Sequence, residues 1–175
     1  MKILGLLRHA KSDWGQSDKR DFDRGLNDRG RQGAQVIGEH IRAHGVDWDT
    51  LVASPAERVK QTLAAALPAF VPQWDERLYL AGTDTIMDVI REKGGDGFAL
   101  LVSGHNPGLG DMLFELVAPK NENALYDEAK VKFPTAAYAV FELDIEEWSD
   151  LRDGCGVLVH FARPRDLDPE LGPEY

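Results

Sequence analysis

Two residues at the end of the first apolar segment have side chains suited to phosphate chemistry. Residues 3–7 form a short apolar run, and Arg8 and His9 follow it directly. Such a run is typical of a buried strand, and ligands of open α/β sheets bind beyond the carboxyl ends of the strands. An arginine at that place can hold an anion, and an imidazole can attack it. The alternative is that both residues only mark where the strand leaves the core, since polar residues commonly flank strands.

A second predicted strand, residues 50–53, ends in Ser54, Pro55 and, three residues later, Arg58. Proline is favoured at the first position of a helix, and Ser54 is expected to cap that helix. Arg58 then lies in the first helical turn, where the helix dipole is already positive. An arginine in this position is explained if it and the dipole face the same anion. A solvent-facing arginine is the alternative.

A third apolar run, residues 98–102, leads into the turn Gly104-His105-Asn106-Pro107-Gly108 and then into a predicted helix over residues 109–117. This segment again delivers a histidine to a glycine-rich strand-to-helix junction. Three such junctions, each with a phosphate-compatible group, are difficult to explain as structure alone.

The remaining segments are predicted to supply the scaffold. Residues 12–25 and 119–134 are polar and turn-rich, and we expect them to be irregular. Regular elements are expected as a helix from Asn27 or Asp28 past residue 41, an edge strand at 70–74, a helix at 83–93, and two antiparallel strands at 136–143 and 157–162.

Length and composition indicate one domain. Of the 175 residues, 43% are hydrophobic and 29% charged, which excludes a disordered chain and one embedded in the membrane. We expect a domain over residues 1–165 and a surface tail over 166–175. The formal net charge of −10 argues against nucleic acid as a partner, so a phosphate site must be a local positive pocket. The N-terminal apolar run is too short for a signal peptide or a membrane span, so we expect a cytoplasmic protein with no membrane partner.

No metal or other cofactor is expected. Cys155 is the single cysteine, which excludes an internal disulfide. His40 and His44 lie four residues apart and could form a metal-binding pair, but no third ligand recurs near them in the sequence. We interpret them as solvated residues at a helix end.

Several motifs together resemble the histidine phosphatase superfamily, and within it the SixA-type phosphohistidine phosphatase branch. The resemblance runs from residue 3 to about residue 165. It is carried by Leu7-Arg8-His9-Ala10 with Lys11-Ser12, Arg24-Gly25-Leu26-Asn27-Asp28-Arg29-Gly30, Ser54-Pro55 with Arg58 and Gln61-Thr62, Gly104-His105-Asn106-Pro107-Gly108, and Phe133-Pro134-Thr135-Ala136-Ala137.

The resemblance implies an α/β fold, a three-layer α/β/α sandwich around a central, mostly parallel sheet. It implies that His9 is the nucleophile that takes the phosphoryl group, without a metal. Arg8, Arg58 and His105 would surround the phosphate. Ser12 and Arg24 lie in matching loops and would contact the substrate. The implied partner is a phosphorylated substrate, a phosphohistidine-bearing protein in the SixA-type branch.

One difference from the pattern of the superfamily restricts the substrates that we expect. Relatives similar to phosphoglycerate mutase carry a glutamate that protonates the leaving group, and Leu80 stands at the matching position. SixA-type proteins also lack an acid there. Two alternatives stay open: a phosphatase or mutase for small phosphomonoesters, and a non-catalytic phosphate-binding module. The carboxylates that could replace the missing acid are Asp13, Asp18, Asp21 and Glu76.

Overall fold

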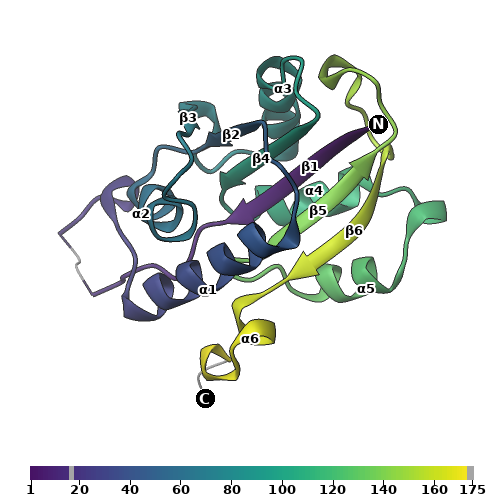
Figure 1. The fold of residues 1–175 in the computed structure, drawn as a ribbon. Helices are drawn as coiled ribbons and strands as arrows, with labels where there is room; N and C mark the ends of the chain where they lie inside the picture. The colour runs from purple at the N-terminus through teal and green to yellow at the C-terminus, as the bar shows by residue number, and fades with distance from the viewer. Residues whose placement is uncertain (16–17, 173–175) are drawn as a thin grey trace.

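A six-stranded sheet forms the centre of the molecule (Figure 1). The computed structural model describes residues 1–15 and 18–172. In spatial order the strands are β3 (Gln73–Trp74), β2 (Thr50–Ala53), β4 (Ala99–Gly104), β1 (Lys2–Arg8), β5 (Tyr138–Leu143) and β6 (Gly156–Ala162). The first four are parallel, whereas β5 is antiparallel to β1 and β6 is antiparallel to β5. The expected mostly parallel sheet is therefore confirmed, with β3 at its edge.

Helices cover both faces of this sheet and complete the three layers. One face carries α1 (Asp28–His44) and α2 (Glu57–Ala66). The other carries α3 (Thr83–Lys93), α4 (Gly108–Leu116) and α5 (Ala124–Val131). The short helices are α6 (Pro164–Leu167) and the 3-10 turns Asp21–Asp23, Glu76–Leu78, Pro119–Asn121, Trp148–Asp150 and Pro169–Leu171.

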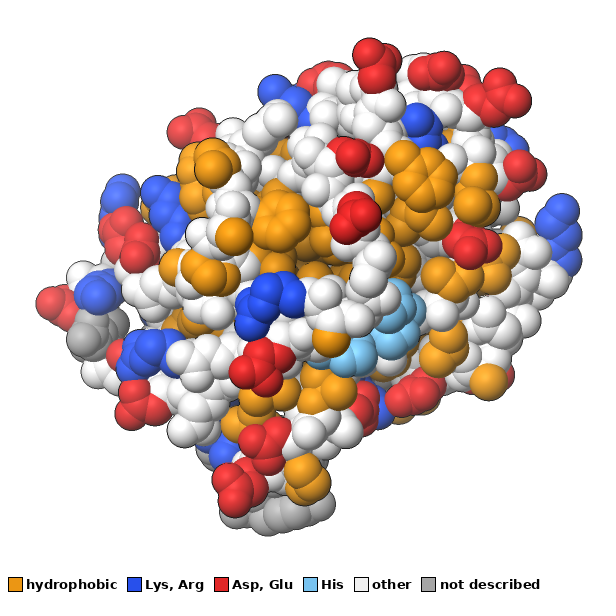
Figure 2. All heavy atoms as spheres, in the orientation of Figure 1, with side chains coloured by type: hydrophobic (Ala, Val, Ile, Leu, Met, Phe, Trp, Pro, Cys, Tyr) orange, Lys and Arg blue, Asp and Glu red, His pale blue; other side chains and the backbone are white. Residues whose placement is uncertain are grey.

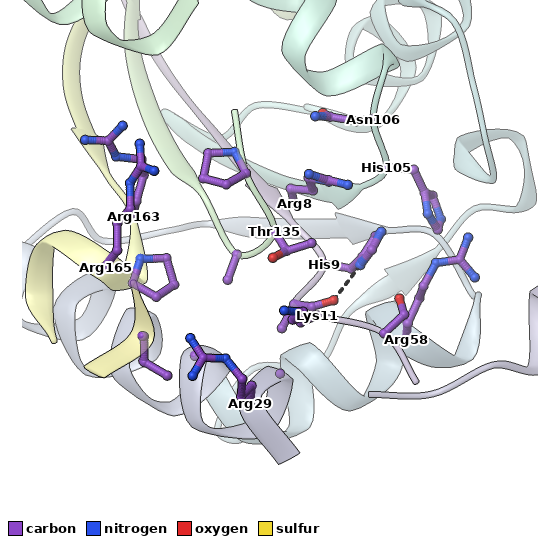
Figure 3. A pocket seen from close by; sticks show the side chains of 18 of the residues that line it. Arg8, His9, Lys11, Arg29, Arg58, His105, Asn106, Thr135, Arg163 and Arg165 are labelled. Carbon is purple, nitrogen blue, oxygen red and sulfur yellow. Dashed lines mark hydrogen bonds between the residues drawn. The ribbon is translucent and has the colours of Figure 1, made fainter. Parts of the chain in front are cut away.

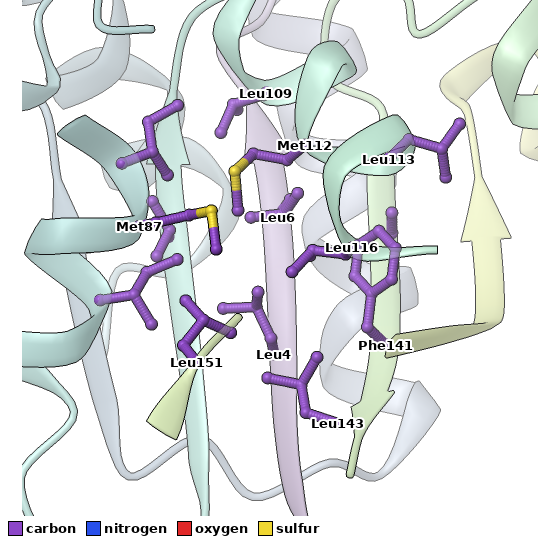
Figure 4. Packing of buried hydrophobic residues seen from close by; sticks show 14 of the residues in the cluster. Leu4, Leu6, Met87, Leu109, Met112, Leu113, Leu116, Phe141, Leu143 and Leu151 are labelled. Atoms are coloured by element: carbon purple, nitrogen blue, oxygen red, sulfur yellow. The ribbon is translucent and has the colours of Figure 1, made fainter. Parts of the chain in front are cut away.

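The buried strands read as continuous apolar runs because helices cover them on both sides. Successive side chains of β1 alternate between the two faces. Leu4 and Leu6 pack under α3 and α4 (Figure 4), whereas Leu7 packs toward α1 and α2. All three leucines are fully buried. This packing holds the end of β1, and with it Arg8 and His9, at a fixed place on the sheet edge.

Three local expectations were wrong. The segment 119–134 contains α5, which begins where the Asn123 side chain accepts a hydrogen bond from the backbone of Tyr126. The loop 12–25 contains the turn Asp21–Asp23, and Ser12 pairs with Leu26 in an isolated β-bridge. Ser54 does not cap α2, which begins two residues later than expected. In each case a polar side chain makes a tertiary or turn contact that composition does not reveal.

The chain returns to the α1 side of the sheet after β6. Residues 163–172 include α6 and the turn Pro169–Leu171, and α6 packs against α1. Arg29 of α1 donates hydrogen bonds to the carbonyl oxygens of Glu170 and Gly172. Residues 173–175, the end of the expected tail, lie outside the described residues. Within the described residues, every helix is too short or too polar to cross a membrane.

Candidate active site

One pocket of about 600 Å³ lies at the carboxyl ends of the parallel strands. It is lined by all six residues predicted from the sequence, namely Arg8, His9, Ser12, Arg24, Arg58 and His105. These residues come from the end of β1, the loop after it, the start of α2 and the end of β4. A strand-to-helix edge thus collects side chains that are far apart in the sequence, as Figure 3 shows.

His9 has one free ring nitrogen. Its side chain is 7% exposed, and Nδ1 lies 2.7 Å from the carbonyl oxygen of Ala10 (Figure 3). A carbonyl only accepts, so Nδ1 carries the proton and donates it, which leaves Nε2 as an unprotonated nucleophile. Burial lowers the pKa of His9 to about 3, and the bond to Ala10 opposes that shift only in part. The imidazole is therefore neutral at physiological pH.

The loop that carries His9 is held on both sides. The Ala10 amide donates to the hydroxyl of Thr62, which itself donates to the carbonyl of Arg58. On the other side, α1 begins so close to this loop that a Cβ at Gly30 would lie 2.1 Å from the Lys11 carbonyl oxygen. Only glycine allows that approach, which fixes the nucleophile's loop between α1 and α2.

Two arginines direct buried donors at the pocket. Arg58 is 3% exposed and donates to the backbone oxygen of Asp21 at 2.8 Å and to its carboxylate at 3.0 Å. Arg8 donates to the carbonyl of Phe133 at 3.2 Å. Within the described part of the chain, Nε of both arginines is buried without a hydrogen-bond partner. A buried, unsatisfied donor is costly, so these two N–H groups suit an anion bound between them.

His105 supplies a third such donor. Its Nε2 lies 2.8 Å from the Ser54 hydroxyl, and the Ser54 oxygen also accepts from the Ala56 amide. The Ser54 hydroxyl can donate to Nε2, and in that tautomer the ring proton of His105 lies on Nδ1. Nδ1 is buried and has no partner among the described residues. Ser54 was predicted as a helix cap, and its contact with His105 could not be found from spacing in the sequence.

Ser12 and Arg24 make contacts of their own at the pocket. Ser12 is buried and its carbonyl accepts from the Asn27 side chain. The guanidinium of Arg24 stacks 3.5 Å from the ring centre of Trp14 and pairs with Asp21 at 2.8 Å. Both residues line the pocket, so the predicted substrate contacts have a suitable position.

Among the described residues of the pocket, none holds a proton for a leaving group. Leu80, 55% exposed, lines the pocket in a left-handed conformation with φ of 52°. Of the four candidate carboxylates, Asp21 is the one among the described lining residues. Burial raises the pKa of Asp21, but hydrogen bonds from Tyr79 and Arg58 outweigh it and lower the pKa to about 2. Asp21 is therefore an anion at neutral pH and holds no proton to give.

Residues 4–79 match the model of the histidine phosphatase superfamily, branch 1. The chain is also 34% identical over 160 residues to an uncharacterised protein of Mycobacterium tuberculosis strain H37Rv, covering 91% of this chain and all of that protein. It is 30% identical, with a TM-score of 0.82, to a structure from Nakamurella multipartitia assigned as phosphohistidine phosphatase SixA. That match covers 93% of this chain and 96% of the other. The chain belongs to the histidine phosphatase superfamily.

A second structure places this histidine phosphatase in the SixA-type branch. A protein of Agrobacterium tumefaciens, also assigned as SixA, is 26% identical with a TM-score of 0.77. The match covers 93% of this chain and 98% of that one. The predicted family, branch and fold are thereby confirmed.

Replacing Arg58 by lysine is expected to impair this phosphatase although the charge is kept. An ammonium group cannot reproduce the planar fork of a guanidinium on phosphate oxygens. Loss of one such charge-assisted pair costs about 1.5–3 kcal/mol, or roughly ten- to a hundredfold in rate. Steady-state kinetics with p-nitrophenyl phosphate measures the effect. Arg77→Lys, at an exposed arginine outside the pocket, is the matched control, and full activity of Arg58→Lys would place Arg58 outside the phosphate site.

The pair His40 and His44 is part of a cluster that the sequence did not reveal. His160 of β6 stacks on His44 with ring centres 3.9 Å apart, and its Nε2 lies 2.7 Å from Nε2 of His40. Figure 2 shows pale blue histidine side chains gathered on this face. His44 is exposed as expected, whereas His40 is half-buried. Across residues 1–15 and 18–172, no three or more His, Cys, Asp or Glu side chains are arranged to hold a metal ion.

We expect this cluster to make the fold sensitive to acid. Burial, and then the charges of His44 and His40, lower the pKa of His160 to about 4. The unfolded histidine titrates near 6.5, so between these values the unfolded chain binds a proton that the folded chain does not. The free energy of unfolding therefore falls as the pH drops from about 6.5 toward about 4. Urea midpoints at two pH values should fall less for His160→Phe and His160→Gln than for the wild type. An equal fall in all three proteins would contradict this assignment.

Proposed function

We propose that this chain is a phosphohistidine phosphatase that takes the phosphoryl group from a histidine of another protein onto its own His9. The observation that supports it is a neutral imidazole with a free Nε2, surrounded by buried donors, in a pocket whose one described carboxylate, Asp21, is ionised. Among the described residues that line the pocket, four side chains have a buried nitrogen without a hydrogen-bond partner: Arg8, Arg24, Arg58 and His105. The names given to the Nakamurella and Agrobacterium structures support the same reaction.

In the first step, Nε2 of His9 attacks phosphorus. A new P–N bond forms as the bond to the leaving group breaks, and Nδ1 of His9 keeps its proton and its bond to Ala10. The equatorial phosphate oxygens carry the developing charge. Arg8 and Arg58 balance it with planar forks, because phosphoryl transfer depends mainly on positioning and charge stabilisation.

The lack of a proton donor among the described pocket residues favours a phosphorus–nitrogen bond in the substrate. A histidine imidazole leaves as a neutral ring once its other nitrogen is protonated, so it needs no donor from the enzyme. An alkoxide does need one. In the second step, water attacks phosphorus and the bond to His9 breaks. Inorganic phosphate is released, and the free imidazole of His9 is regenerated. The residues named above supply the charge for both steps, and the proposed reaction uses no metal.

The test is a comparison of substrates. One arm measures kcat/KM for a phosphohistidine-bearing phosphotransfer protein, and the other measures it for a panel of sugar and glycerate phosphates. We expect the protein substrate to be preferred by at least a hundredfold. Equal or faster turnover of a sugar or glycerate phosphate would overturn the proposal in favour of a phosphatase for small phosphomonoesters.

A further inference from the structure

The pocket extends well beyond the place of one phosphate. Its volume of about 600 Å³ is in the range of sites that enclose a whole small molecule or a segment of a larger one. His9, Arg58 and His105 occupy one end. The other end is formed by the start of α1, the segment before β5, and residues 163–172. Figure 3 shows Arg163 and Arg165 on the opposite side of His9 from Arg58 and His105.

The far end is built from basic side chains. We call them the distal basic cluster: Arg29, Lys132, Arg163 and Arg165. Among the described lining residues, eight are Lys or Arg and one, Asp21, is acidic. Asp21 pairs with Arg58 and Arg24, so it belongs to the His9 end. A chain with a net charge of −10 has thus concentrated positive charge in a single hollow.

Two members of the cluster hold its frame in place. The Arg163 side chain donates two hydrogen bonds to Asp166, of 2.9 and 3.0 Å, and a third to Glu128 at 2.7 Å. Arg29 donates to the carbonyls of Glu170 and Gly172, which ties the end of the described chain to α1. These contacts fix the position of α6, and α6 carries Arg165.

The remaining two charges are held less firmly: Arg165 acts on the Asp166 carboxylate only through its charge, and Lys132 is exposed. Lys132 and Arg165 make no hydrogen bond or ion pair with any described residue, although Arg165 is half-buried. Like charges brought together repel, and the half-buried Arg165 loses hydration without a hydrogen bond to a described residue in return. An anionic group of a ligand relieves both costs, which a neutral group does not.

We infer that the distal basic cluster binds a second anionic group of the substrate, a carboxylate or a phosphate, separate from the phosphoryl group that is transferred. The inference rests on the proposed phosphatase site, since that site fixes the first anion beside His9. On a phosphohistidine protein the second group is an acidic side chain near the phosphohistidine. On a small molecule it is a second phosphate. Lys132 and Arg165 are the residues that select for it.

A series of non-hydrolysable ligands of increasing length tests the inference by binding alone, without turnover. Isothermal titration calorimetry compares alkane-α,ω-bisphosphonates of two to eight carbons with n-alkylphosphonates of the same length, so that the apolar chain cancels. At one length we expect the bisphosphonate to bind at least tenfold tighter, well above the roughly twofold statistical advantage of two equivalent ends. No advantage beyond about twofold at any length would overturn the inference.

Variants locate the effect. Lys132→Ala combined with Arg165→Ala should abolish the bisphosphonate advantage and leave the affinity for methylphosphonate within about twofold of the wild type. Lys120→Ala combined with Arg152→Ala removes the same two charges outside this pocket and should change neither affinity. Equal losses for both ligands in the first variant would mean a general or structural effect and would overturn the inference. If methylphosphonate does not bind the wild-type protein at all, the proposed phosphate site itself fails.

The source of the second anion is then distinguished with two pairs of substrates. One pair is a phosphohistidine peptide with glutamates beside the phosphohistidine and the same peptide with alanines. The other is fructose 1,6-bisphosphate and fructose 6-phosphate. A preference in kcat/KM that disappears in the Lys132→Ala, Arg165→Ala protein identifies the source, and no such preference in either pair would contradict the inference.

Discussion

The His9→Ala variant is expected to lose turnover almost completely while it keeps its fold. Removal of an enzymatic nucleophile typically costs on the order of 10⁴-fold or more in kcat. The His9 side chain faces the pocket, and its one hydrogen bond goes to the neighbouring carbonyl of Ala10. Its removal therefore leaves the sheet and helix packing intact. Initial rates with p-nitrophenyl phosphate measure the loss, and the urea midpoint measures the fold.

Trapping of the intermediate identifies the nucleophile directly. Wild-type protein that is quenched during turnover of a ³²P-labelled substrate should carry label on His9, and the His9→Ala protein should carry none. His44→Ala, which removes an exposed histidine outside the pocket, should label like the wild type. Label on any other residue of the wild type would disprove the assignment of His9.

A steep dependence on the leaving group is the second large effect that we expect. Leu80, which cannot donate a proton, lines the pocket, and the Asp21 carboxyl is ionised with a pKa of about 2. General acid catalysis typically contributes 10²–10⁴-fold. Alkyl phosphates should therefore react slower than a phosphohistidine peptide by about that factor. Aryl phosphates with acidic phenols, such as p-nitrophenyl phosphate, should fall between them.

The measurement is kcat/KM across leaving groups of graded pKa. Asp21→Asn serves as a control, because loss of a true general acid would slow alkyl phosphates selectively. We expect Asp21→Asn to change all substrates by a similar factor. A flat profile, with sugar phosphates as fast as p-nitrophenyl phosphate, would reveal a hidden acid.

The residues around the phosphate could be predicted because each follows an apolar run in the sequence. Strand ends are visible as a change from apolar to polar residues, and parallel strands bring their carboxyl ends to one edge. Arg8, His9, Arg58 and His105 were all found in this way or through motifs at these ends, and all line one pocket. Their chemical roles remain predictions until the variants are measured.

Contacts between side chains of distant segments could not be predicted. The hydrogen bond between Ser54 and His105 joins residues 51 positions apart. No motif in the sequence marks Lys132, Arg163 or Arg165 as residues of the pocket. His160 meets His40 because β6 returns beside α1, which spacing in the sequence does not show. Such contacts depend on the three-dimensional path of the chain, and a single sequence carries no direct record of that path.

The antiparallel direction of β5 and β6 separates the residues proposed to carry out phosphoryl transfer from the C-terminal residues proposed to select the substrate. Strand β5 starts at the pocket edge and β6 ends there. The chain therefore reaches that edge twice more, after Arg8, His9, Arg58 and His105 in the sequence. A chain that ended at Ala162 would keep Arg8, His9, Arg58 and His105 but would lose Arg163 and Arg165. The C-terminal segment therefore lines the pocket without being part of the strands that hold His9. We expect that its sequence and length can be changed to admit a different substrate while those strands stay the same.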